Sequence, residues 1–270
     1  QEPTNIFVIE PDQKFSSTLI SKGVRFHMTV DDLPPDDEPN VVMFAVKPQV
    51  MDDIIPPYAK YADCTVFISI AAGKTIDYFE KILGHEAAIV RVMPNTPAAV
   101  RRGISAAFAN PNVSINQQKV CNELMEAVGE LHWLENEGQL DAVTAVSGSG
   151  PAYVFLLAEC LAEAAKNLGI SEKLAERLGR ATISGSGELL YQSEEDITTL
   201  RRNVTSPGGT TEAALDILMD KDALKALIKD AVKIDQENDT LYHSLALAYM
   251  SVDQFDQAIN NLQKAISINK

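Results

Sequence analysis

The stretch TVFISI (Thr65–Ile70) decides the fold of the first half of the chain. It is a short, uncharged run rich in β-branched and aromatic residues, which is typical of a strand buried on both faces of a parallel sheet. The sequence predicts four more strands of this kind, at Asn5–Glu10, Val41–Val46, Ala88–Met93 and Ile104–Ala109.

Amphipathic helical patterns separate these strands, at Phe15–Ser21, Val50–Tyr61, Thr75–Leu83 and Gln117–Gly129. Strands that alternate with helices form doubly wound parallel sheets, in which helices cover both faces. The sequence therefore predicts a Rossmann-like, dinucleotide-binding α/β domain over residues 1–134.

The pattern changes to helices alone from Gln139 to about Ala231. Within this region Pro151–Leu168 is apolar on nearly every face, which marks a helix buried inside the protein or by a partner chain. Gly185 and Gly187 lie inside the next helical pattern and permit close contact between helices. We predict an all-α dimerisation domain over residues 135–232 and at least a homodimer.

Two glycine-and-hydroxyl stretches lie in this helical region, VSGSGPAY (Val146–Tyr153) and SPGGTT (Ser206–Thr211). Each leads directly into a helical pattern. The first N–H groups of a helix lack partners and carry the positive end of the helix dipole, so they attract anions. We expect the two stretches to form a pocket for a small carboxylate or phosphate. The alternative is that their glycine and proline residues only separate helices.

The last part of the chain carries a sequence repeat. The stretch Ala231–Gln236 recurs as Ala265–Lys270, at the spacing of 34 residues that is typical of tetratricopeptide repeats. The positions that match the repeat signature are Tyr242, Leu245, Ala246, Tyr249, Phe255, Ala258 and Ala265. We expect a short helical-repeat tail, a tetratricopeptide-like hairpin, over residues 233–270. A peptide is its expected partner, although a single repeat normally stacks on others.

Composition limits the range of functions. The chain has 270 residues, 46% of them hydrophobic, and its net charge of −15 argues against nucleic acid or an anionic membrane as a partner. Its three cysteines are isolated, and it opens with no signal peptide, so we expect a cytoplasmic protein. The four histidines are far apart, so no metal site is expected.

Five motifs together give the chain a family resemblance. They are, in order, AVKP (Ala45–Pro48), AAG (Ala71–Gly73), VMPNTP (Val92–Pro97), AVT (Ala142–Thr144) before VSGSGPAY, and NVTSPGGTT (Asn203–Thr211). With this set, residues Ile6 to about Val232 resemble pyrroline-5-carboxylate reductase, the last enzyme of proline biosynthesis. The resemblance implies a dinucleotide-binding domain, then a helical domain through which subunits dimerise, and dimers that can assemble into rings.

The resemblance implies NAD(P)H-dependent reduction of 1-pyrroline-5-carboxylate to L-proline, with this cyclic imino acid bound in the helical domain. The substrate carboxylate meets backbone N–H groups of SPGGTT in such a site. The implied catalytic residues are Thr211 and Ser206; the Thr211 hydroxyl donates or relays a proton to the imine nitrogen, or else only positions the site. The implied substrate-binding residues are Glu137, Ser149, Asn203, Gly208, Gly209, Thr210 and Thr211. Of these, Glu137 and Asn203 either line the pocket or are structural.

The implied cofactor-binding residues lie at or just after the carboxyl ends of the predicted strands, where open α/β sheets bind ligands. They are Glu10, Pro11, Ala45, Val46, Lys47, Pro48, Ala71, Ala72, Gly73, Asn95 and Thr96. Lys47 faces the cofactor's phosphates or is a solvated lysine at a strand end. The cofactor is NADP(H) or NAD(H). Glu10 favours NAD(H), because a carboxylate accepts hydrogen bonds from ribose hydroxyls and repels a 2′-phosphate.

The chain departs from the family pattern at its start. It contains no G-x-G-x-x-G, the loop that holds the pyrophosphate, and it opens on what would be the second strand of the sheet. We therefore expect an N-terminally incomplete Rossmann-like domain with poor affinity for the cofactor, and an activity impaired by truncation.

Two other functions stay open. One is another two-domain dinucleotide dehydrogenase, such as a relative of 3-hydroxyacid dehydrogenases. Those enzymes usually carry a catalytic lysine or an acid–base pair on the long interface helix, where this chain offers only Glu159, Glu163 and Lys166. The other is a non-enzymatic interaction protein that uses the helical-repeat tail.

Overall fold

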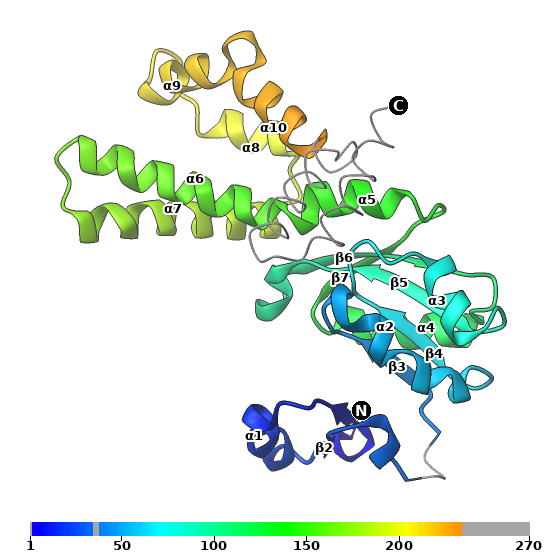
Figure 1. The fold of residues 1–270 in the computed structure, drawn as a ribbon. Helices are drawn as coiled ribbons and strands as arrows, with labels where there is room; N and C mark the ends of the chain where they lie inside the picture. The colour runs from blue at the N-terminus through cyan, green and yellow to red at the C-terminus, as the bar shows by residue number, and fades with distance from the viewer. Residues whose placement is uncertain (1, 35–37, 234–270) are drawn as a thin grey trace, which may run out of the picture. The chain divides into compact units, whose positions relative to one another are not determined.

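A computed structural model describes residues 2–34 and 38–233 of the chain. The chain forms two compact units, unit 1 over residues 1–140 and unit 2 from Asp141 onward. Unit 1 holds all the strands of the described residues, and unit 2 holds the longest helices (Figure 1). The expected helical-repeat tail lies, apart from Lys233, outside the described residues and stays a prediction.

Unit 1 is built on a five-stranded sheet in the order β3-β4-β5-β6-β7. The strands are β3 (Val41–Phe44), β4 (Val66–Ser69), β5 (Ala88–Met93), β6 (Gly103–Ala109) and β7 (Gly129–Trp133). Neighbouring strands are parallel, except that β5 and β6 are antiparallel. The prediction of a wholly parallel sheet is therefore wrong at β6. The connection from Met93 to Gly103 is too short for the crossover that a parallel pair needs.

A separate two-stranded parallel sheet precedes this one in the chain. Its strands, β1 (Phe7–Ile9) and β2 (Arg25–His27), are joined through the short helix α1 (Ser16–Ser21). Sequence patterns miss β2, because a three-residue strand with two basic residues shows no apolar run. They also miss β7, and the predicted helix Gln117–Gly129 extends three residues beyond the end of α4 at Glu126.

Helices cover both faces of the five-stranded sheet, as the sequence predicts. Alternate residues of β4 and β5 enter two different cores. Phe67 and Ile89 pack on the side of α2 (Met51–Ile54) and α3 (Ile76–Leu83), whereas Val66 and Val90 pack on the side of α4 (Ile115–Glu126). Figure 1 shows these helices flanking the sheet. Burial on both faces explains why the strands are continuous apolar runs.

The predicted helix Val50–Tyr61 is broken after one turn. The α2 helix ends at Ile54, and a 3-10 helix, Pro56–Tyr61, follows it. The adjacent prolines Pro56 and Pro57 supply no N–H groups and so cannot continue the α-helical hydrogen bonding.

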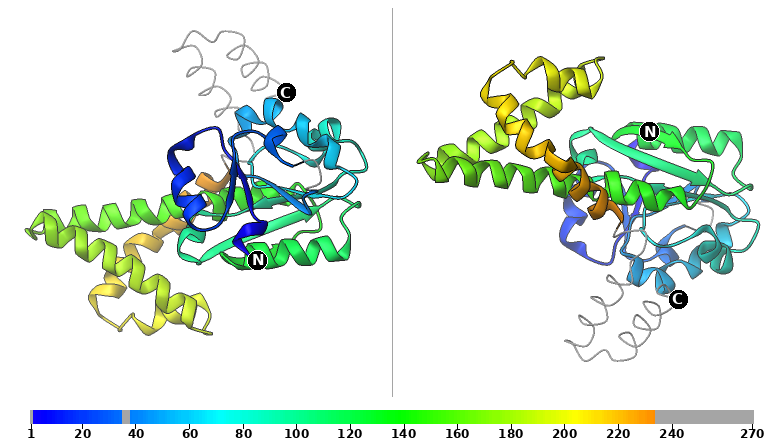
Figure 2. Two further views of the ribbon diagram at one scale, coloured as in Figure 1. Left: turned by 90° about the horizontal axis from the view of Figure 1, so that it is seen from below. Right: turned by 90° about the horizontal axis from the view of Figure 1, so that it is seen from above.

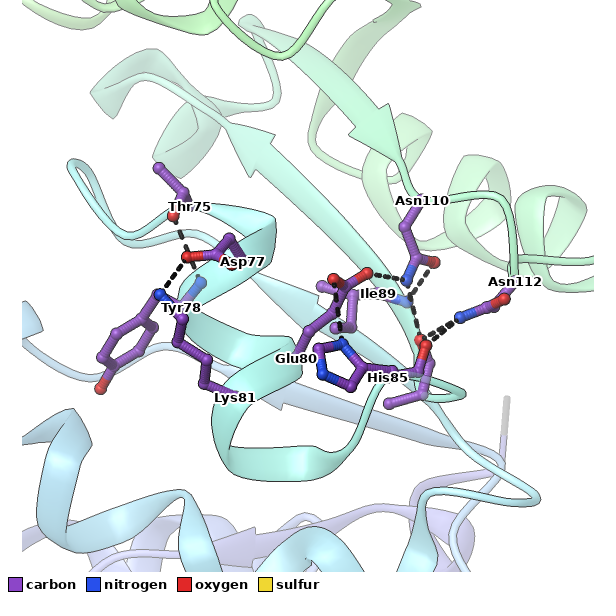
Figure 3. Close-up of polar contacts among 10 residues, drawn as sticks. Thr75, Asp77, Tyr78, Glu80, Lys81, His85, Ile89, Asn110 and Asn112 are labelled. Carbon is purple, nitrogen blue, oxygen red and sulfur yellow. Dashed lines mark hydrogen bonds and ion pairs between the residues drawn. The ribbon is translucent and has the colours of Figure 1, made fainter.

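The buried Asn110 connects α3 to the sheet through side-chain hydrogen bonds (Figure 3). Asn110 is 4% exposed, and its side-chain amide donates to the Glu80 carboxylate and to the Ala87 carbonyl. Its side-chain oxygen accepts from the Ile89 N–H at 3.0 Å. The contacts with Ala87 and Ile89 hold the amino-terminal end of β5, at the edge opposite to the predicted ligand edge, and the contact with Glu80 joins this end to α3.

The described residues of unit 2 form helices joined by short connections, with no strand among them. Its helices are α5 (Gln139–Val143), a π-helical turn (Thr144–Gly148), α6 (Gly150–Asn167), α7 (Glu172–Gln192), α8 (Ile197–Asn203), α9 (Thr210–Met219), a short 3-10 turn (Asp220–Asp222) and α10 (Ala223–Lys233). Helices α6 and α7 lie side by side and antiparallel (Figure 2). A left-handed glycine, Gly169 with a φ of +86°, follows α6 and allows the chain to reverse.

The close contact between these helices is made by Gly179. A Cβ at this position would lie 2.6 Å from the Ala158 carbonyl oxygen of α6. The contact predicted for Gly185 and Gly187 is not made within the described residues, where a Cβ on either would meet no atom within 4 Å. These two glycines therefore lie on a part of α7 that no other described segment covers.

Helix α6 exposes its apolar side chains. Those with large exposed surfaces are Val154, Phe155, Leu156, Leu157 and Leu161. By length and composition, the helical stretch Gln139–Asn167 is also apolar enough to cross a membrane. An apolar helix at a subunit interface has the same composition, so this property alone does not decide between a membrane and a partner subunit.

Candidate active site

Three of the predicted cofactor segments follow neighbouring strands of the five-stranded sheet. Ala45–Pro48 follows β3, Ala71–Gly73 follows β4, and Asn95 and Thr96 come two and three residues after β5. Because β3, β4 and β5 are adjacent and parallel, the three segments lie at the same carboxyl edge of the sheet. Open α/β sheets bind their ligands at this edge.

The segment after β4 has a backbone that allows a ligand to come close. Gly73 has a φ of +75°, and a Cβ on it would meet no atom of the described residues within 4 Å. At the start of the segment, the Ala71 N–H donates to the Ser69 hydroxyl. At its end, Thr75 is the N-cap residue of α3, and its hydroxyl accepts from the Tyr78 N–H (Figure 3).

A lysine next to this segment was missed by sequence reasoning. Lys74 Nζ lies 3.4 Å from Asp52 Oδ1 and 3.9 Å from the centre of the Tyr78 ring. The Tyr78 hydroxyl donates to the same carboxylate, which lowers the pKa of Asp52, while burial and the neighbouring carboxylate raise the pKa of Tyr78. The three side chains join the segments that follow β3 and β4. A basic residue directly after AAG was the available signal.

Of the other predicted residues at this edge, Lys47 and Thr96 are exposed, and Asn95 makes a structural hydrogen bond. Lys47 is exposed, and its carbonyl accepts from the Val50 N–H where a 3-10 helix begins. The side-chain oxygen of Asn95 accepts from the Ile104 N–H at 3.0 Å, so it holds the connection to β6. Thr96 is exposed and begins the next 3-10 helix.

Glu10 and Pro11 lie at the carboxyl end of β1, in the two-stranded sheet. The Glu10 carboxylate accepts from the Asp12 N–H, and the Asp12 carboxylate accepts from the Lys14 N–H, both at 2.9 Å. Two carboxylates therefore lie close together in the chain at this strand end, where they can accept hydrogen bonds from hydroxyl groups.

Glu137, a predicted substrate-binding residue, makes its contacts inside unit 1. Its Oε1 atom accepts from Arg91 Nη1 and from the Ile76 N–H, each at 2.7 Å. The Arg91 side chain is 6% exposed and that of Glu137 is 27% exposed. This oxygen is therefore already held by two donors.

The SPGGTT stretch of unit 2 forms a tight turn that begins a helix. The Gly209 N–H donates to the Ser206 carbonyl, Pro207 follows Ser206, and Gly208 has a φ of +71°, which is the pattern of a type II turn. Helix α9 begins at Thr210, so the N–H groups of its first turn, Thr211 included, have no acceptor within the helix.

This turn already holds a carboxylate. Glu212 Oε2 accepts from the Gly208 N–H at 2.6 Å. Ser206 and Thr211 are both exposed. Asn203 ends α8 just before the turn, and its side-chain amide donates to Glu195 at 2.9 Å. The turn thus joins exposed hydroxyl groups to backbone donors that suit a carboxylate.

The first glycine-and-hydroxyl stretch differs from what the sequence predicts. Instead of a loop before a helix, residues 144–148 form a π-helical turn between α5 and α6. The Ser149 N–H donates to the Thr144 carbonyl at 2.8 Å, and the Ser149 carbonyl accepts from the Ala152 N–H. The Ser149 N–H is therefore used by the helix itself, and the expected anion site at this stretch stays a prediction. π-Helical turns are common at functional sites.

Comparison with known proteins supports the same two-part organisation. Residues 137–239 match the family model described as pyrroline-5-carboxylate reductase dimerisation. The chain is 43% identical to the pyrroline-5-carboxylate reductase of Pseudomonas aeruginosa over 72% of this chain and 71% of that protein. It is 36% identical to the enzyme of the same name from Synechocystis, over 86% of this chain and 85% of that protein.

Solved structures give the same result. The structure of a pyrroline-5-carboxylate reductase from Coxiella burnetii matches with a TM-score of 0.80, at 35% identity and over 87% of both chains. The pyrroline carboxylate reductase of Plasmodium falciparum, solved with NADP bound, matches with a TM-score of 0.74, at 31% identity, over 88% of this chain and 87% of that one.

Proposed function

The chain belongs to the pyrroline-5-carboxylate reductase family, and we propose that it reduces 1-pyrroline-5-carboxylate to L-proline with a nicotinamide dinucleotide. The observation that carries this proposal is the turn Ser206–Gly209 before α9, which joins donors for a carboxylate to the Thr211 hydroxyl. The enzyme is thus an oxidoreductase of proline biosynthesis.

Unit 1 would hold the dinucleotide at the carboxyl edge of β3, β4 and β5. The positive φ and open surroundings of Gly73 let the backbone of Ala71–Gly73 approach the cofactor, and this geometry fits one part of a dinucleotide, whose pyrophosphate has no G-x-G-x-x-G loop in this sequence. Lys74 and Lys47 supply positive charge near phosphates. A bound reduced nicotinamide would supply the hydride for the imine carbon. Asn95 and Thr96 would lie toward the nicotinamide, with Asn95 held in place by the Ile104 N–H.

The substrate would bind at the turn of unit 2. Its carboxylate accepts hydrogen bonds from the N–H groups of Gly208, Thr210 and Thr211, and the positive end of the α9 dipole favours it. As the imine carbon gains a hydride, the ring nitrogen gains a proton. The Thr211 hydroxyl donates or relays this proton, and Ser206 assists from the same turn. Asn203 orients this region through its bond to Glu195.

Glu10 supports a preference for NADH over NADPH. Its carboxylate and that of Asp12 lie at the end of β1, where they accept hydrogen bonds from ribose hydroxyls and repel a 2′-phosphate. Because the related enzyme from Plasmodium falciparum was solved with NADP, NADP(H) is the alternative for this chain.

A homodimer is the form we propose for the active enzyme. The exposed apolar side chains of α6, together with the family match to a dimerisation model over residues 137–239, support a second copy as the partner. A ring of dimers is a further proposal from the family resemblance. The acidic net charge and isolated cysteines support a cytoplasmic location.

The reverse reaction tests this function. The purified chain is incubated with L-proline at alkaline pH, with NAD and then with NADP, and the absorbance of the reduced nicotinamide is followed. We expect turnover with at least one cofactor and a higher kcat/KM with NAD. If neither cofactor is reduced, while a reductase homologue is active in the same assay, this chain does not carry out the reaction.

A further inference from the structure

A buried arginine lies at the carboxyl edge of the sheet. Arg91 is in β5, where every residue is buried, and it pairs in register with Ser69, the last residue of β4. Along β5 its side chain points to the same face as Ile89, toward α3. A buried guanidinium is costly unless it is paired and hydrogen-bonded. The residue that pairs with the Arg91 guanidinium is therefore important for the structure of this edge of the sheet.

That partner is Glu137, which comes from the segment after β7. A single oxygen, Glu137 Oε1, accepts from both Arg91 Nη1 and the Ile76 N–H, each at 2.7 Å. Arg91 is fixed by the sheet, and it fixes the carboxylate in turn. The carboxylate then holds the backbone of Ile76 at a set place beside β5.

Ile76 is the first residue of α3 and directly follows the segment Ala71–Thr75. The other end of this segment is held by the bond from the Ala71 N–H to the Ser69 hydroxyl. Ser69 and Arg91 lie opposite each other on adjacent strands. The hydrogen bonds at the two ends of the segment Ala71–Thr75 are therefore anchored at the same position along these strands. Gly73, in its middle, is the residue whose backbone is open to a ligand.

We propose that Glu137 and Arg91 are positioning residues for the cofactor, and that they act by holding the segment Ala71–Thr75 through the Ile76 N–H. The proposal rests on the proposed function, which assigns this segment to the dinucleotide. It also gives Glu137 a role other than the substrate contact that the sequence predicts. Loss of a positioning residue changes the Kd of the cofactor, whereas loss of a substrate contact changes the KM of the substrate. The two roles can therefore be separated by measurement.

Two substitutions test the proposal. Glu137→Gln keeps an oxygen for the Ile76 N–H but removes the charge that holds Arg91. Ile76→Pro removes the donor N–H and leaves the ion pair intact; proline is tolerated at the first position of a helix. The extended backbone of Thr75, with a φ of −83° and a ψ of 165°, is compatible with a following proline. If Glu137→Gln fails to fold, Ile76→Pro still provides the test.

Three quantities are measured for each variant: the Kd of NADH by fluorescence titration, KM and kcat for the imino acid at saturating cofactor, and amide hydrogen exchange of residues 71–75 without cofactor. We expect the Kd of NADH to rise by about tenfold in both variants, as loss of roughly one charge-assisted hydrogen bond predicts. The substrate KM stays within about twofold of the parent value, and exchange of the segment becomes faster.

Matched variants serve as controls. Glu135→Gln removes one negative charge from an exposed residue of the same segment and is expected to leave all three quantities unchanged. Ile76→Ala removes the apolar side chain but keeps the N–H, so the difference between Ile76→Ala and Ile76→Pro reports the hydrogen bond.

Each other outcome overturns the proposal. A raised substrate KM with an unchanged Kd for NADH would make Glu137 a substrate ligand. Lower thermal stability with unchanged Kd and exchange would make the pair merely structural. If the unmodified chain binds no dinucleotide, the proposed function fails by itself. Hydrogen exchange then still decides whether the pair holds the segment, because that measurement needs no cofactor.

Discussion

The Glu212 carboxylate accepts a hydrogen bond from the Gly208 N–H at 2.6 Å, across the turn that begins α9. The chain itself therefore demonstrates that this turn suits a carboxylate. In the proposed function the substrate carboxylate uses the same group of donors. Glu212 must then either move aside or remain close to a second negative charge.

Glu212→Gln is expected to lower the KM for 1-pyrroline-5-carboxylate by about fivefold, with little change in kcat. The reason is the loss of roughly 1 kcal/mol of repulsion between two carboxylates near the surface. Steady-state kinetics at saturating cofactor measure the change. Asp216→Asn, one turn further along α9 and exposed, is the charge control and should leave KM as it is. A higher KM in Glu212→Gln would show instead that Glu212 attracts the positively charged imine.

Thr211→Val is expected to lower kcat by about a hundredfold. The substitution keeps the side-chain shape but removes the hydroxyl that donates or relays a proton to the ring nitrogen. Thr211→Ser, which retains a hydroxyl, should keep most of the activity. The pH profiles of kcat for both variants complete the measurement. An unchanged kcat in Thr211→Val would limit this residue to positioning the helix start.

Glu10→Ser is expected to shift the ratio of kcat/KM for NADPH over NADH upward by about fivefold, since it removes a carboxylate that repels a 2′-phosphate by ~1 kcal/mol. Kinetics with both cofactors give the ratio. Glu86→Ser, an exposed carboxylate just before β5, is the matched control. If the ratio stays constant in Glu10→Ser, the end of β1 does not select the cofactor.

Asn110→Ala is expected to destabilise the chain by about 2–3 kcal/mol, because it leaves the buried Ile89 N–H and the Ala87 carbonyl with fewer partners. Urea unfolding followed by circular dichroism measures the free energy. Asn112→Ala removes one exposed amide that donates to the His85 carbonyl and, at 3.3 Å, to the Ala87 carbonyl, which keeps its bond from Asn110; it should cost less than about 1 kcal/mol. Equal losses in the two variants would contradict the role given to the burial of Asn110.

Much of the fold follows from local patterns. The apolar runs at Thr65–Ile70 and Ala88–Met93 predict strands covered on both faces, and the two cores confirm it. The Rossmann-like unit followed by a helical dimerisation unit is likewise confirmed by the related structures. The direction of β6 does not follow from its apolar run; the signal for it is the length of the connection from Met93 to Gly103, which is too short for a parallel crossover.

The site was predicted only in part. Motifs located the segments at the carboxyl edge, since each follows an apolar strand. They could not reveal that Glu137 is held by Arg91, because those residues are far apart in the sequence and meet only in the folded sheet. Nor could they distinguish a loop from the π-helical turn at Thr144–Gly148, since glycine and serine suit both.

The forward reaction is the most direct assay of the proposed reductase activity. The purified chain is given 1-pyrroline-5-carboxylate and NADH or NADPH, and L-proline is measured by chiral chromatography beside the loss of reduced cofactor. We expect one L-proline for each reduced nicotinamide consumed, with formation abolished or strongly slowed in Thr211→Val. Cofactor loss without L-proline, or no reaction from protein that binds the dinucleotide, would contradict it.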